Sequence, residues 1–174
     1  MLVNILIMIA RSYIESNLKQ LDKLYNKAGT QKKELYYSKL AMLEMCGWIE
    51  ESMDDIVQMC ANRVLKQRQN KSYITKKVIK PTYGFEYDRH FKKMLIHVVG
   101  LMSIERVENK VDQLKYARLT SALGSLKEVR NKEAHTHLKG VTRRVDAPSV
   151  TLQYFTYVYE GLKEIEDVLK SLKL

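Results

Sequence analysis

The segment "SVTLQYFTYVYEGLKEIEDVLKSL", residues 149–172, decides the fold class because its apolar residues recur at steps of three and four. This spacing lines them up along one face of an α-helix, and charged residues fill the other face. We therefore expect a long amphipathic helix that buries one face and exposes the other. The apolar positions are Leu152, Phe155, Tyr159, Leu162, Ile165, Leu169 and Leu172, and the polar positions are Lys163, Glu166, Asp167 and Lys170.

The same period over most of the remaining chain predicts a bundle of four or five helices. Only 7 Gly and 2 Pro interrupt the 174 residues, and 45% of the residues are hydrophobic, as in a folded, mostly helical protein. Thr30 is placed to cap the second helix, and Gly47 marks a position where that helix can bend. We expect one all-α domain, residues 1–174, with helices over 3–28 and 31–68, from Asp88, from Asn109 or Val111, and over 149–172.

A basic segment, "QNKSYITKKVIKPTYGFEYD" at 69–88, breaks the helical period. We interpret it as an insertion, either a loop or a small β-like element. Residues 63–93 have ten Lys or Arg against two Asp or Glu, a net charge of +8 within a chain total of +10. Such a concentration of charge attracts polyanions, and interleaved aromatic rings stack on bases, which predicts RNA binding. The residues expected to contact RNA are Lys76, Lys77, Lys80 and Arg89. In the alternative interpretation, the segment is a solvent-exposed β-hairpin whose tyrosines pack on the bundle.

The cysteines and histidines predict neither a disulfide framework nor a metal site. Cys46 and Cys60 have no partner at a metal-ligand spacing, and we expect His90 and His97 to be ordinary partly buried histidines. We predict no cofactor. The apolar start "MLVNILIMIA" lacks a basic n-region and a cleavage site and is too short to cross a bilayer, so we expect a buried helix and a cytoplasmic location.

The stretch "EVRNKEAHTH", residues 128–137, combines residue types suited to a phosphodiester. Arg130 has a permanently charged fork for phosphate oxygens, and His135 titrates near neutrality and can move a proton. On a helix, Asn131 and His135 share a face, whereas five residues rotate Arg130 about 140° away from His135. Their convergence requires an unwound helix end or a second copy of the chain. The alternative is a surface pair at a helix end, where a cation is favoured by the helix dipole.

The sequence "VRNKEAHTH", followed by Gly140, Pro148 and an amphipathic C-terminal helix, resembles the Arg-Asn-x-x-x-His signature of the HEPN superfamily. The resemblance covers the last 65 residues, and "AHT" with "GLKEIEDVL" is similar to the RiboL-PSP-HEPN subgroup. It implies a metal-independent endoribonuclease that acts as a homodimer and leaves a 2′,3′-cyclic phosphate and a 5′-hydroxyl. Members include toxins and phage-defence effectors, so an antitoxin protein is an expected partner.

The resemblance also implies roles for the motif residues. Arg130 would hold phosphate, His135 would act as general acid or base, and Asn131 would support both. An acidic residue from an earlier helix often assists, and we name Glu51 first among Glu44, Glu51 and Asp55. The alternative function is a non-catalytic module of the same fold that binds nucleic acid, a nucleotide or a protein partner.

Overall fold

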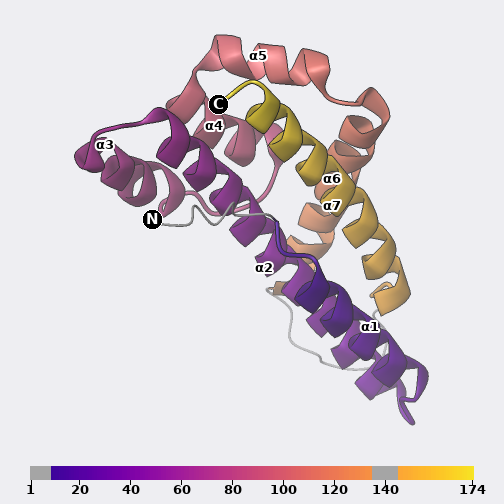
Figure 1. Ribbon diagram of the computed structural model, residues 1–174. Coiled ribbons are helices and arrows are strands. Elements are labelled where there is room, and N and C mark those ends of the chain that lie inside the picture. Colours follow the sequence, from indigo (N-terminus) through magenta and orange to yellow (C-terminus); the bar gives the residue numbers. More distant parts are fainter. Residues whose placement is uncertain (1–8, 135–144) are drawn as a thin grey trace.

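The computed structural model describes residues 9–134 and 145–174, and every regular element in these two ranges is helical (Figure 1). The all-α prediction is confirmed, but the described residues form seven α-helices and two π-helical segments instead of four or five helices. The elements are α1 (Ser12–Asn26), α2 (Gln31–Val64), α3 (Arg68–Tyr73), η1 (Ile74–Ile79), η2 (Tyr87–Phe91), α4 (Lys92–Val99), α5 (Leu101–Lys110), α6 (Gln113–Ala134) and α7 (Pro148–Ser171).

Helix α7 fulfils the prediction for 149–172 and packs against α1, α2 and α6. Phe155, Leu162 and Leu169 are fully buried, and the Trp48 ring of α2 meets the Phe155 ring edge to face with centroids 5.1 Å apart. Gly161 brings α7 close to α6, because a Cβ at this position would lie 2.5 Å from the Cβ of Leu119. A small residue here therefore sets how closely the two helices pack.

The prediction that Glu166 lies on the solvent-exposed polar face of α7 was wrong. Its side chain is only 1% exposed, although the helical pattern places it with the solvent-facing charges. Lys163 Nζ lies 3.1 Å from Glu166 Oε2, and Lys170 Nζ lies 2.7 Å from Oε1. The long lysine side chains cover the carboxylate while their charges compensate for its loss of water.

The N-terminal helix is shorter than predicted. Among the described residues it begins at Ser12, and residues 9–11 are not helical. The chain before it is tied to α2, because the Trp48 indole donates a hydrogen bond of 2.7 Å to the carbonyl of Ala10. Thr30 caps α2 as expected by accepting a hydrogen bond from the Lys33 amide, and α2 continues through Gly47 to Val64, four residues short of the predicted 68.

The basic segment is the predicted loop only in part, and it contains no strand. Residues 68–79 form α3 and η1, and the segment becomes irregular only near Pro81, before η2 begins at Tyr87. Ile74 and Val78 are buried on the bundle, four residues apart as on one helical face. The prediction was wrong for residues 69–79 because β-branched residues mixed with lysines resemble a strand, while burial against α2 and α4 favours the helix.

The predicted third helix is divided at Gly100. This residue has φ +80°, a left-handed conformation that glycine adopts without strain, and it separates α4 from α5. Met102, two residues after this division, is 80% exposed. Helix α6 then starts at Gln113, where the Asp112 carboxylate accepts a 2.9 Å hydrogen bond from the Lys115 amide.

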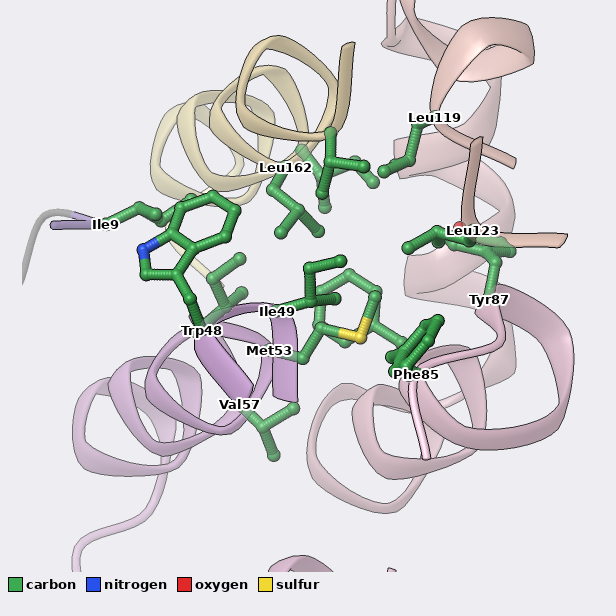
Figure 2. Close-up of a cluster of buried hydrophobic side chains, with 14 of the residues drawn as sticks. Ile9, Trp48, Ile49, Met53, Val57, Phe85, Tyr87, Leu119, Leu123 and Leu162 are labelled. Carbon is green, nitrogen blue, oxygen red and sulfur yellow. The ribbon is translucent and has the colours of Figure 1, made fainter. Parts of the chain in front are cut away.

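The core unites α2, α6 and α7 with the end of the basic segment (Figure 2). Phe85 and Tyr87 are 2% and 4% exposed and lie among the core side chains, so these two aromatic rings are not free to stack on bases. Tyr73 and Tyr83, in contrast, are 60% and 80% exposed. No helix within the described ranges is long and apolar enough to span a membrane.

Candidate functional site

The motif lies at the end of α6. Arg130 and Asn131 occupy its last turns, and the helix ends at Ala134. Asn131 is exposed. His135, the predicted general acid or base, and His137 lie outside the described residues, so the distance between Arg130 and His135 stays a prediction.

Arg130 is held where α6, α2 and the basic segment meet. Its Nη2 donates a 3.2 Å hydrogen bond to Glu50 Oε1, and the guanidinium lies 6.0 Å from the centre of the Phe85 ring. The side chains of Arg130 and Glu50 are 35% and 33% exposed. The guanidinium is thus positioned by a carboxylate and an aromatic ring while part of it still faces solvent.

Glu50, and not Glu51, is the acidic residue at Arg130. Adjacent residues on a helix point about 100° apart, so only one of them can face α6. Glu51 is exposed and accepts a 3.3 Å hydrogen bond from the Tyr13 hydroxyl of α1. Glu44 is exposed, and Asp55 is half-buried with a pKa raised by burial and by the charge of Glu51.

A second carboxylate, Asp54, lies one helical turn after Glu50. Burial raises the pKa of Asp54 to about 6, and the negative charges of Glu50, Asp55 and Glu51 add to the increase. A carboxyl group that titrates near neutrality can exchange a proton under ordinary conditions. The structure therefore contains a carboxylate of altered acidity next to the Arg130–Glu50 pair.

Helix α6 also fixes the segment that leads into η2. Lys127 Nζ lies 2.6 Å from Glu86 Oε1, and this ion pair lowers the pKa of Glu86. Lys127 and Arg130 are three residues apart on α6, so they share a face that meets this segment. The Glu86 amide in turn donates a 3.1 Å hydrogen bond to Nδ1 of His90.

His90 is confined on two sides. A Cβ at Gly84 would lie 2.7 Å from its Cε1, and Gly84 has φ +121°, so glycine is required for this close approach. Since Nδ1 accepts a hydrogen bond, the neutral ring has its proton on Nε2. Burial lowers the pKa of His90, although Glu86 acts in the opposite direction.

The predicted RNA-binding residues divide into two groups. Lys77 and Arg89 line a surface hollow of about 410 Å³, whereas Lys76 and Lys80 are exposed outside it. We refer to this feature as the basic hollow, and its lining residues are Lys77, Val78, Pro81, Thr82, Tyr83, Arg89, His90, Lys93, Met94 and His97. Within the described ranges, no group of three or more His, Cys, Asp or Glu residues is arranged to hold a metal ion.

Sequence reasoning missed Glu50 and Lys127. Glu50 is 80 positions from Arg130, and no motif spacing connects them. The helical period could have indicated both residues. Glu50 follows the buried Ile49 and precedes the buried Met53, so it flanks the buried face of α2. Lys127 lies about one helical turn before Arg130 on α6.

We found no match to this chain among protein-family models, curated proteins or solved structures. The HEPN resemblance therefore rests on the motif and the helices around it.

Proposed function

We propose that this protein is a metal-independent endoribonuclease of the HEPN type. The observation that supports this best is the half-buried Arg130 of the motif, positioned by Glu50 and Phe85 with part of its guanidinium facing solvent. The basic hollow adds positive charge, and Tyr83 in its lining belongs to the segment that contains Phe85. An anionic strand is attracted to such a surface.

In the proposed reaction, the ribose 2′-oxygen attacks the adjacent phosphorus. The new O2′–P bond forms as the P–O5′ bond breaks, which leaves a 2′,3′-cyclic phosphate and a 5′-hydroxyl. His135 takes the 2′-hydroxyl proton or protonates the leaving oxygen, and Arg130 stabilises the charge that builds on the phosphate oxygens. Asn131 is the polar residue that supports Arg130 and His135.

Glu50 is assigned the role of positioning Arg130. A carboxylate beside the guanidinium limits its rotamers before substrate arrives, which reduces the entropy lost on binding phosphate. The proposed homodimer would bring two copies of the α6 end together, which offers a route for His135 and Arg130 to converge although they do not share a helical face. An antitoxin partner would restrain the activity.

A non-catalytic module of the same fold is the second candidate. The observation in its favour is that Arg130 already has a partner, Glu50, which is the arrangement of an ordinary ion pair between helices. In this case Arg130 would stabilise the bundle, and the basic hollow would bind RNA without cleavage.

Substitution of Arg130 separates the two candidates. Exposed or half-exposed ion pairs contribute about 0–1 kcal/mol to stability, so Arg130→Ala should lower the melting temperature only slightly. The nuclease proposal predicts that the same variant loses RNA cleavage almost completely, and that Arg130→Lys restores little of it because lysine lacks the planar fork.

The matched control is Arg118→Ala on the same helix. Arg118 is exposed and its guanidinium lies 5.5 Å from the Tyr157 ring centre, so its removal deletes a similar cation–ring contact. We expect this variant to cleave RNA as the wild type does. Full activity of Arg130→Ala would remove Arg130 from the mechanism and favour the non-catalytic module.

A further inference from the structure

The basic hollow has three cationic side chains and no acidic residue in its wall. Lys77 of η1, Arg89 of η2 and Lys93 of α4 line a space of about 410 Å³. This volume is within the range of about 300–1,000 Å³ that small-molecule and cofactor sites occupy. Like charges gathered around a concave surface repel one another, and an anion in the hollow relieves that repulsion.

These cations are also free of strong partners. Neither the Lys77 nor the Lys93 side chain has a hydrogen bond or ion pair with any residue in the described ranges, and the Arg89 side chain has an ion pair only with Glu86, at 3.6 Å. Neighbouring lysines differ, since Lys92 Nζ lies 2.7 Å from Glu108 and Lys127 Nζ lies 2.6 Å from Glu86. The closest contacts of Glu86 and Glu108 are thus with lysines outside the hollow, and the second oxygen of Glu86 lies 3.6 Å from Arg89 and 3.9 Å from His90.

His90 adds a hydrogen-bond donor. The Glu86 amide occupies its Nδ1 at 3.1 Å, and Gly84 packs against the ring, so the Nε2–H is the only free donor of the neutral ring. The ring is one of the residues that line the hollow. An imidazole N–H beside cationic side chains is suited to donate to a phosphate oxygen.

Tyr83 adds an aromatic face at the same place. Its side chain lines the hollow and is 80% exposed, in contrast to the buried Phe85 and Tyr87 of the same segment. A nucleic-acid base gains about 1–3 kcal/mol by stacking on such a ring. Three cations, one hydrogen-bond donor and one exposed ring match a nucleotide, in which a sugar joins a phosphate to a base.

We infer that the basic hollow is a subsite for one nucleotide unit of an RNA strand. Lys77, Arg89 and Lys93 contact its phosphate, His90 donates Nε2–H to a phosphate oxygen, and Tyr83 stacks on the base. This inference rests on the proposed function for its ligand, RNA. The Arg130 guanidinium lies 6.0 Å from the centre of the Phe85 ring, and Tyr83, two residues before Phe85, lines the hollow, so this one segment adjoins both the motif and the proposed subsite.

The test compares charge-matched pairs in binding to a 2′-O-methyl RNA oligonucleotide, which lacks the nucleophile and is not cleaved. The hollow pair, Lys77→Gln with Lys93→Gln, should weaken binding at least tenfold and reduce the salt slope by about one. The pair Lys76→Gln with Lys80→Gln, outside the hollow on the same segment, should weaken it less than threefold. Equal losses for both pairs would overturn the subsite in favour of diffuse attraction.

Two further variants test the specific contacts. Tyr83→Ala should weaken binding several-fold, whereas Tyr83→Phe should not, because the ring and not the hydroxyl stacks on the base. His90→Phe should weaken binding at constant net charge. Unchanged affinity of both Tyr83→Ala and His90→Phe would overturn the inference.

Two measurements separate this inference from the proposed function. If the hollow pair loses binding while wild type leaves unmodified RNA intact, the nuclease proposal fails and the subsite stands. If wild type cleaves RNA and the hollow pair binds and cleaves equally well, the subsite fails and the nuclease stands. Binding of adenosine 5′-monophosphate as tight as that of the oligonucleotide would overturn the assignment to a strand and indicate a free-nucleotide site.

Discussion

Replacement of Asp54 by Asn tests the electrostatics beside Arg130. Burial and the neighbouring carboxylates raise the pKa of Asp54 from 3.8 to about 6, a difference of about 2 pKa units. At about 1.36 kcal/mol per unit, the ionised group destabilises the folded state by at most about 3 kcal/mol. Because the side chain is only half-buried, solvent screening reduces this to about 1–2 kcal/mol.

The direction in which stability changes with pH follows from the linkage between proton binding and folding. A raised folded-state pKa means that the folded protein binds this proton more tightly than the unfolded chain does. The stability contributed by Asp54 is therefore full below pH 3.8 and is lost as the pH rises through about 6. Asparagine has no charge to bury. The free energy of unfolding of Asp54→Asn should therefore increasingly exceed that of the wild type as the pH rises over the same interval.

Urea unfolding at pH 4 and pH 7.5 measures this effect. We expect Asp54→Asn to raise the free energy of unfolding by about 1–2 kcal/mol at pH 7.5 and by almost nothing at pH 4. Asp88→Asn is the matched control, since Asp88 is 84% exposed and should change stability by less than about 0.5 kcal/mol at either pH. A gain that is equal at both pH values, or a loss at pH 7.5, would refute the reasoning.

Three other predictions concern packing, thiols and metal dependence. Gly161→Ala should lower the free energy of unfolding by about 1–3 kcal/mol, because the added Cβ would lie 2.5 Å from the Cβ of Leu119. Thermal melts measure this loss, and an unchanged melting temperature would contradict the close packing of α6 and α7. Cys46 and Cys60 are buried, and burial raises the pKa of each thiol to about 12. Iodoacetamide at pH 8 should therefore modify them in urea but not in the folded protein. Rapid labelling without urea would show that the thiols are accessible. RNA cleavage should survive EDTA, and activity lost with EDTA and restored by a divalent metal would refute the metal-free reaction.

Long amphipathic helices were predictable from the sequence because one period extends over many residues. The pattern at 149–172 corresponds to α7, and the polar Thr30 correctly predicted the start of α2. Burial of Glu166 was not predictable, since a charged residue at the edge of an apolar stripe becomes buried only when lysines of its own helix cover it.

The basic segment misled the prediction for a different reason. Local letters such as "YITKKVIK" favour strand and loop, but a helix allows Ile74 and Val78 to pack on the bundle together. Tertiary contacts determined the result, and these depend on elements outside the segment. The same holds for the division of the segment's aromatic rings into buried Phe85 and Tyr87 and exposed Tyr73 and Tyr83.

The residues of the candidate site were predictable from local patterns, but the contacts between elements were not. The motif indicated Arg130 and Asn131, and the charge pattern indicated Lys77 and Arg89, which line the basic hollow. The partner of Arg130 was not predictable, because the choice between Glu50 and Glu51 depends on how α2 is rotated against α6. That rotation is set by core packing over the whole length of α2.

The measurement that tests the endoribonuclease proposal most directly is the analysis of product ends after incubation of purified protein with labelled single-stranded RNA and transfer RNA in EDTA. We predict 2′,3′-cyclic phosphate and 5′-hydroxyl ends with wild type and no products with His135→Ala of equal thermal stability. The proposal would be contradicted by intact RNA in both samples, or by equal cleavage by both proteins.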